Sequence, residues 1–313
     1  MSKASRRRLS ALRILARLTV ILLCLGLAAL LAFHQQIPDV AGLGLILDNL
    51  APWLGLGILV LLLMTIAVGG RGTYVALLVP TVVWGVLFGP ESLPSAAVDG
   101  KDTLVVASQN VHQDAVTSAR ALAGSGAEVI TLQELGEGQI DLVTDELKPS
   151  HPYYYSVSTV GLWSSYPLSN PEPLDLGLGW DRALRADVET GSGPVRVYAV
   201  HAASARPTGH DERDTMLASL ADYVEKDPSS KVIAAGDFNA TSTDRHFAPV
   251  AEQLDDVHYS AWGPAMTWPR SPFAMLGIDH VMVRGIAGTS LERIPAGDSD
   301  HYALRASVDL ADD

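Results

Sequence analysis

Cysteine is almost absent from this chain of 313 residues: Cys24 is the only one, and it lies within an apolar run. One cysteine cannot form an intramolecular disulfide or a cysteine-rich zinc site. No cysteine follows residue 24, so thiol catalysis in the polar part of the chain is excluded. A motif for a nucleophilic serine is missing as well. Covalent catalysis by serine or cysteine is therefore not expected.

Basic residues are scarce beyond residue 100. Residues 101–313 contain 15 Lys or Arg and 31 Asp or Glu, whereas residues 1–100 contain seven and four. Such an acidic region repels nucleic-acid backbones, so a protein that grips long nucleic acids through many basic side chains is disfavoured unless a metal supplies positive charge. The change in composition predicts two domains, a membrane region at 1–100 and a catalytic domain at 101–313.

Three long apolar runs lie in the first region, at about residues 18–33, 51–68 and 74–88. They predict about three transmembrane helices. The third run is short and contains Pro80, so an interfacial or kinked segment is an alternative there. A cleavable signal peptide is the alternative for the first run, but no small-residue cleavage site with a polar start follows it.

Basic residues also predict the orientation, because cytoplasmic ends of membrane helices are enriched in Lys and Arg. Six basic residues precede residue 18, and Arg71 lies between the second and third runs, whereas residues 35–49 carry only acidic charge. Three crossings then predict a multi-pass cell-membrane protein with an extracytoplasmic catalytic domain. With two crossings, that domain would be cytoplasmic.

In the second region, polar side chains follow strand-like apolar segments. Segment 102–108 leads to Asn110 and segment 127–132 leads to Glu134, with a helical pattern between them. Strands connected in this way end at one edge of a sheet. Capping of the next helix is the alternative role for Glu134.

Later segments end in the same manner. One ends at His201, and another runs into Asp237 and Asn239 through Gly236, which allows a sharp turn and a close approach to a ligand. An ordinary strand exit is the alternative for that segment. With the polar residues beside the last two predicted strands, the candidate site comprises Asn110, Glu134, His201, Asp237, Asn239, Asp279, Asp300 and His301.

Carboxylates, amides and imidazoles in this combination suit a hard divalent cation and a phosphate group. Oxygen ligands favour Mg²⁺ or Mn²⁺, and Glu134 is the strongest single candidate ligand. A carboxylate-held imidazole, such as His301 beside Asp279, can orient or deprotonate an attacking water. Asp237 and Asn239 can then position the water and the phosphoryl oxygens.

Four segments resemble, in order, the motifs of the endonuclease/exonuclease/phosphatase superfamily: Gln133-Glu134, Gly236-Asp237-Phe238-Asn239, Ile278-Asp279-His280 and Ser299-Asp300-His301. The resemblance spans nearly all of residues 102–309 and identifies the chain as a membrane-anchored bacterial member. It implies an α/β fold, the four-layer α/β/β/α sandwich of pancreatic deoxyribonuclease. It also implies metal-dependent cleavage of a phosphoester by direct attack of water.

Residue by residue, the resemblance implies three kinds of role. The metal would be held by Asn110, Glu134 and Asp300. Water and phosphate would be handled by Asp237 and Asn239, and Asp279 would orient His301. His201 would bind or protonate the phosphate side.

The chain also departs from the family pattern at two positions. Ser165 stands where an Arg is usual, and His280 where many members have Tyr. Both departures predict an unfamiliar substrate pocket. Other polar residues are expected at the surface, outside the site: His112, Arg182, Arg185 and Arg213. For Arg182 and Arg185, contact with a phosphate is the alternative.

The leading hypothesis is a membrane-anchored, Mg²⁺- or Mn²⁺-dependent phosphoesterase that hydrolyses a phosphomono- or phosphodiester. The membrane helices and the acidity of residues 101–313 favour a lipid-linked or small envelope phosphoester over nucleic acid as the substrate. No protein partner is indicated. One alternative is an extracytoplasmic metal-dependent nuclease acting on DNA or RNA. Another is a non-catalytic binding protein that retains the fold, although clustered carboxylates without a metal or partner would be costly.

Overall fold

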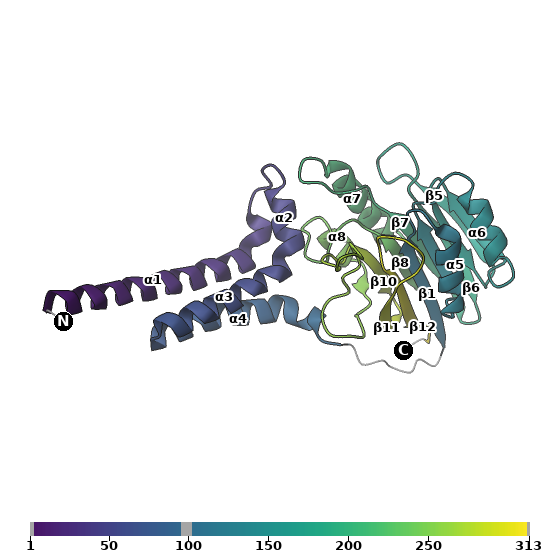
Figure 1. The fold of residues 1–313 in the computed structure, drawn as a ribbon. Helices are drawn as coiled ribbons and strands as arrows, with labels where there is room; N and C mark the ends of the chain where they lie inside the picture. Colours follow the sequence, from purple (N-terminus) through teal and green to yellow (C-terminus); the bar gives the residue numbers. More distant parts are fainter. Residues whose placement is uncertain (1–2, 95–101, 312–313) are drawn as a thin grey trace. The chain divides into compact units, whose positions relative to one another are not determined.

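The computed structural model describes residues 3–94 and 102–311, which fall into two compact units, Met1–Ser92 and Leu93–Asp313 (Figure 1). The boundary predicted near Lys101 falls in residues 95–101, outside the described residues.

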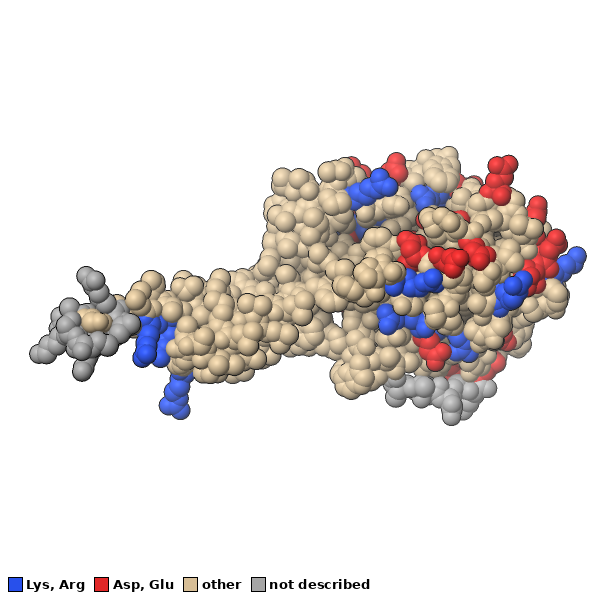
Figure 2. All heavy atoms as spheres, in the orientation of Figure 1, with Lys and Arg blue, Asp and Glu red and all other residues tan. Residues whose placement is uncertain are grey.

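Helices make up the first unit: α1 (Lys3–Phe33), η1 (His34–Gln36), α2 (Leu43–Leu50), η2 (Ala51–Leu54), α3 (Gly55–Val68) and α4 (Arg71–Ser92). Three helical stretches are long and apolar enough to cross a membrane: Ser10–Gln36, Leu43–Val68 and Arg71–Ser92. Pro80 lies inside α4, and the helix continues on both sides of it. The short third run of the sequence is therefore part of a helix of spanning length. Lys, Arg, Asp and Glu are sparse over most of this unit and frequent on the second (Figure 2).

Two six-stranded sheets form the second unit. The first has the order β11-β12-β1-β2-β4-β3, with bounds Ala287–Ile294, Ala303–Asp309, Thr103–Asn110, Val129–Gln133, Val160–Ser164 and Tyr153–Val157. The second has the order β5-β6-β7-β8-β10-β9, with bounds Leu168–Leu174, Ala183–Thr190, Gly193–His201, Val232–Asp237, Asp279–Arg284 and Asp255–Asp256.

Helices cover the outer face of each sheet. On the first sheet, α5 (Ala115–Gly124) and α6 (Gln139–Leu147) bury residues such as Leu122 and Val143 against the strands. On the second, α7 (Asp211–Glu225) and α8 (Ala248–Ala251) do the same with residues such as Leu217 and Val250. The inner faces of the two sheets pack against each other through alternate strand residues, such as Val106 of the first sheet and Val197 of the second. The predicted four-layer α/β/β/α sandwich is confirmed.

Helix α8 is a single turn, Ala248–Ala251, because a series of turns from Thr241 to Phe247 precedes it. Strands β5 and β11 were not expected. β5 lies at the edge of its sheet, where its prolines cost no ladder hydrogen bond.

Candidate active site

Strand register brings the predicted polar residues to one edge of the two sheets. Parallel β1 and β2 pair Asn110 with Gln133, so Glu134 follows directly beyond the ladder. In the other sheet, parallel β7 and β8 pair His201 with Asp237, and antiparallel β10 places Asp279 opposite the same Asp237. Because the sheets pack face to face, these residues from distant parts of the chain converge.

Asn110 links the two sheets at this edge. Its Nδ2 donates to Glu134 Oε1 at 3.0 Å and to Asp237 Oδ2 at 3.0 Å. The Asn110 and Asp237 side chains are buried, whereas the Glu134 side chain is 37% exposed. Glu134 is therefore the carboxylate through which solvent and solutes reach this cluster.

His301 enters from the segment before β12. Its Nδ1 donates to Asp279 Oδ2 at 2.8 Å, and both side chains are buried. Ser299 fixes this segment to β1, since its Oγ donates to the Asn110 carbonyl at 2.5 Å and accepts from the His301 backbone at 3.0 Å. The expected imidazole–carboxylate pair is present.

Asn239 forms hydrogen bonds with the Asp237 carboxylate. Its backbone N–H donates to Asp237 Oδ1 at 2.9 Å, and its Nδ2 lies 3.3 Å from Asp237 Oδ2 and 3.0 Å from the Ala202 carbonyl. The Asn239 backbone has a φ of +49°, which an Asn adopts more readily than most residues. Asn239 thereby fixes the direction of the buried carboxylate.

Arg182 is not a solvated strand residue, as the sequence suggested, but a half-buried neighbour of His201. Its Nη2 lies 2.9 Å from Nε2 and 3.0 Å from Nδ1 of His201. The same atom, His201 Nε2, is 3.7 Å from Glu134 Oε1. Arg185 is not solvated either, because it pairs with Glu172 at 2.7 Å.

Asp300 is the one predicted residue that does not join the cluster. It is exposed, and its Oδ2 accepts a hydrogen bond from Trp268 Nε1 at 2.9 Å. Within residues 102–311, no contact links it to Asn110 or Glu134.

Neither departure from the family pattern alters this edge. Ser165 lies beside Glu128, at the opposite end of β2 from Glu134. His280 is buried and bridges Asp256 Oδ2 at 2.7 Å and the Ala240 carbonyl at 2.9 Å. The expectation that these two positions make the substrate pocket unfamiliar stays a prediction.

Two residues near the site were missed. His112 Nδ1 lies 3.3 Å from Glu134 Oε2. Arg213, expected at the surface, is fully buried, and its Nη1 donates to the Asn239 carbonyl at 2.8 Å while pairing with Asp244. The signal for Arg213 was its place among the apolar residues of α7, one turn from Met216 and Leu217.

Burial and neighbouring charges shift the pKa values of Asp237, His301 and His201 in different directions. Burial, and then the charge of Asp279, raise the pKa of Asp237. Burial opposes protonation of His301, but the charge and hydrogen bond of Asp279 outweigh it and raise the pKa of His301 to about 10. Burial and the Arg182 charge lower the pKa of His201 to about 3. One imidazole is thus cationic and the other neutral at pH 7.

The donor set fits a hard divalent cation. Asn110 Oδ1 and Asp279 Oδ1 are buried and have no hydrogen-bond partner, which is costly unless a cation or ligand compensates. Oxygens from Asp237 and Asp279 and a nitrogen from His301 lie within 4.8 Å of one another. Oxygen-rich, carboxylate-containing surroundings of this kind suit Mg²⁺ or Mn²⁺.

A family model matches residues 107–301, and its description is the endonuclease/exonuclease/phosphatase family. The chain belongs to this family. Because the match covers most of the chain and includes the whole convergent edge, it makes this endonuclease/exonuclease/phosphatase family member a phosphoester-hydrolysing enzyme that depends on a divalent metal.

Solved structures agree on the fold. A humanized D. rerio TDP2 carrying 14 mutations matches with a TM-score of 0.55 and 20% identity, over 66% of this chain and 99% of that one. Sphingomyelinase C from Streptomyces griseocarneus matches with a TM-score of 0.53 and 16% identity, over 66% and 99%. A family protein from Leptotrichia buccalis matches with a TM-score of 0.55 and 15% identity, over 66% and 99%. No curated protein matches by sequence.

Proposed function

We propose that this chain is a membrane-anchored bacterial phosphoesterase that uses Mg²⁺ or Mn²⁺ and water to hydrolyse a phosphomono- or phosphodiester. The observation that carries the proposal is the convergence of Asn110, Glu134, Asp237, Asp279 and His301 at one edge of two sheets. Two buried oxygens of this set, Asn110 Oδ1 and Asp279 Oδ1, have no hydrogen-bond partner, and their burial is costly unless a ligand compensates.

Asn110 and Glu134 are the residues we assign to the metal, with the exposed Asp300 at most a more distant contributor. When bound, a divalent cation there polarises a phosphoryl oxygen and offsets the negative charge that develops in the transition state. Glu134 suits this task because its carboxylate is partly exposed and has no Lys or Arg within ion-pair distance, and Asn110 because its buried Oδ1 has no hydrogen-bond partner.

Asp237 is the group we assign to the attacking water. Its raised pKa makes it a better proton acceptor near neutral pH than an ordinary carboxylate. The water oxygen forms the bond to phosphorus as its proton moves to Asp237, and the bond from phosphorus to the leaving oxygen breaks. Asn239 keeps the carboxylate aligned through two hydrogen bonds.

His301 serves the phosphoryl group rather than the water in this proposal. With Nδ1 bonded to Asp279 and the pKa raised to about 10, the cationic ring retains Nε2 as a donor to a phosphoryl oxygen. This differs from the expectation that His301 orients or deprotonates the water. His201, neutral and beside Glu134, completes the phosphate side.

The preferred substrate is a lipid-linked or small envelope phosphoester, met on the extracytoplasmic side. Three apolar helices support membrane anchoring, and the acidity of residues 101–313 disfavours a polyanion. Similar folds occur in both a sphingomyelinase and in TDP2, which has been crystallised with a single-strand DNA product. A nuclease is therefore the competing outcome of the test.

Full-length protein in detergent with Mg²⁺ or Mn²⁺ should be offered phospholipids, small phosphate esters, plasmid DNA and RNA. We expect turnover of lipid or small esters, its loss in EDTA, and a fall of about 10²-fold or more in Glu134→Gln. Glu137→Gln, an exposed change of the same charge three residues away, should retain activity. Rapid DNA cleavage without ester turnover would reverse the substrate order. No hydrolysis at all, or an active Glu134→Gln, would refute the proposal.

A further inference from the structure

Arg182 differs from five arginines of the second unit that form ion pairs, and from the arginines that bond backbone carbonyls, such as Arg284. Arg120, Arg185, Arg196, Arg213 and Arg305 each have a carboxylate within ion-pair distance. Arg182 has none among residues 102–311, and its only hydrogen-bond partner there is His201. A guanidinium is always charged, so Arg182 brings to this edge a positive charge that feels Asp237 and Glu134 but has no direct ion pair with either.

One donor of this guanidinium is buried and unused. Arg182 Nε has no hydrogen-bond partner, although burial of an unsatisfied charged donor costs free energy. Nε and a neighbouring terminal nitrogen form a planar pair of donors, which matches two oxygens of a phosphoryl group. Arg182 therefore has a free donor that could bind an oxyanion, and it lies beside His201, which is assigned to the phosphate.

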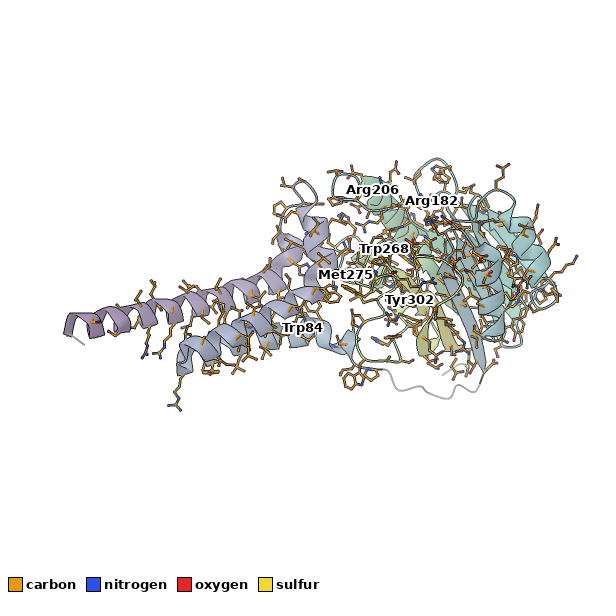
Figure 3. The ribbon with its side chains drawn as sticks, in the orientation of Figure 1. Trp84, Arg182, Arg206, Trp268, Met275 and Tyr302 are labelled. Atoms are coloured by element: carbon orange, nitrogen blue, oxygen red, sulfur yellow. The ribbon has the colours of Figure 1, made fainter. Side chains whose placement is uncertain are left out.

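The surroundings hold Arg182 rigidly. Its carbonyl accepts from the His201 backbone at 3.1 Å, which fixes the main chain to the end of β7. The guanidinium lies 5.1 Å from the ring centroid of Trp180, within range of a cation–π contact. The preceding loop is tied by Asp175 Oδ1, which accepts from the backbone N–H groups of residues 177, 178 and 179. Arg182, labelled in Figure 3, therefore pays little entropy on binding a ligand.

We propose that Arg182 is a substrate-binding residue that donates to the non-bridging oxygens of the phosphoryl group, opposite the residues assigned to the metal. The inference rests on the proposed function, because it specifies how that same site holds its substrate. It also gives His201 a second task, since its Nε2 lies 2.9 Å from Arg182 Nη2 and 3.7 Å from Glu134 Oε1, so the imidazole can orient the guanidinium beside Glu134.

Binding of inorganic phosphate to the full-length protein in detergent with Mn²⁺ tests the inference without needing turnover. We expect Arg182→Gln to weaken phosphate affinity about tenfold or more, and Arg182→Lys to recover part of it, because lysine keeps the charge and loses the paired donors. Mn²⁺ affinity, followed by electron paramagnetic resonance, should remain unchanged. Arg120→Gln, which removes a surface charge paired with Glu146, should bind phosphate as the parent does.

A double variant separates phosphate binding from a role exerted only through His201. If Arg182 binds phosphate directly, Arg182→Gln weakens phosphate affinity further in the His201→Gln background. If it acts only by orienting His201, the double variant binds phosphate as His201→Gln alone does, and the inference is wrong.

The two proposals fail in different ways. Unchanged phosphate affinity in Arg182→Gln, with hydrolysis still dependent on Glu134, overturns the inference and leaves the proposed function intact. Absence of hydrolysis in the parent overturns the proposed function, while the loss of phosphate affinity in Arg182→Gln would still support Arg182 as an oxyanion-binding residue.

Discussion

Backbone strain at single residues marks the catalytic edge. Among the described residues, six other than glycine have positive φ, and three of them lie here: His112 at +53°, Glu134 at +58° and Asn239 at +49°. A left-handed conformation costs of order 1 kcal/mol or more for a residue with a Cβ. Such strain persists where the surrounding structure holds the residue in place, and it is often found at functional sites.

Glu134 allows that cost to be measured. Glu134→Ala and Glu134→Gly both remove the carboxylate and its contacts with Asn110 and His112, but only glycine tolerates a φ of +58° freely. We expect the glycine variant to be more stable than the alanine variant by about 1 kcal/mol in thermal or urea unfolding. Both should be inactive. An alanine variant of equal or greater stability would show that the backbone there is unstrained.

At the scale of elements, the packing of neighbouring strands determines the position of the site residues. Gly236 pairs with Val200 in the β7–β8 ladder, immediately before Asp237, and has a φ of +153°. A Cβ built on it would lie 1.9 Å from the Val200 carbonyl oxygen. Only glycine therefore lets β8 approach β7 closely enough to set Asp237 beside His201.

Replacement of that glycine should damage both stability and activity. We expect Gly236→Ala to lose about 3 kcal/mol or more of unfolding free energy, since backbone must shift to relieve the clash. Gly191→Ala is the control, because an added Cβ there meets no atom within 4 Å. It should change stability by no more than about 0.5 kcal/mol. Similar stabilities for the two variants would contradict the close approach of β7 and β8.

His280 joins β10 to the loop after β8 and gives that joint a pH dependence. Burial opposes protonation, but the charge and hydrogen bond of Asp256, with the Ala240 carbonyl, outweigh it and raise the pKa of His280. The unfolded value is about 6.5. Because the folded pKa is higher, this contribution to stability is complete below about pH 6.5 and is lost as the pH rises through the folded value.

Asp256→Asn tests this joint. The variant should be less stable than the parent at about pH 6, and the difference should shrink as the pH rises through the folded pKa of His280. Asp255→Asn removes an exposed charge at the neighbouring residue and should show no such trend. Thermal unfolding of the parent and both variants across the pH range measures these stability differences. A pH-independent difference for Asp256→Asn would exclude a raised pKa of His280 that depends on Asp256.

The edge was predictable from sequence because its signals are local. Apolar strands that run directly into Glu134 and Asp237 place these groups by strand geometry alone, and motif order supplied His301. Arg182 and Arg213 were misjudged because their partners, His201 and the Asn239 carbonyl, are 19 and 26 residues away in sequence. Contacts of that kind depend on how strands and helices pack, which periodicity does not encode.

Ser165 shows that some of the missing geometry could have been inferred. An antiparallel β4 beside β2 necessarily carries its carboxyl end to the amino end of β2 and away from Glu134. Strand direction alone would have removed Ser165 from the pocket. β5 was unpredictable for a different reason, because its two prolines normally argue against a strand and are tolerated only at the sheet edge.

At the scale of the whole molecule, charge and apolar length together determine where the enzyme works. Three helices of spanning length precede the second unit. An odd number of crossings puts the residues before α1 and the residues after α4 on opposite sides of the bilayer. Basic residues before residue 18 and Arg71 between the second and third spans favour the cytoplasm for those two positions.

Fusion reporters test this orientation in the full chain. Alkaline phosphatase fused after residue 313 should be active and green fluorescent protein at the same place dark, because phosphatase needs the extracytoplasmic side and the fluorescent protein folds in the cytoplasm. Fusions after Gly70, beside Arg71, should give the reverse pattern and serve as the control. A fluorescent, phosphatase-negative C-terminal fusion would place Glu134 and His301 in the cytoplasm and redirect the substrate search to cytoplasmic phosphoesters. An extracytoplasmic result restricts the search to phosphoesters of the envelope, among which the proposed role of Arg182 favours substrates that present a phosphoryl group.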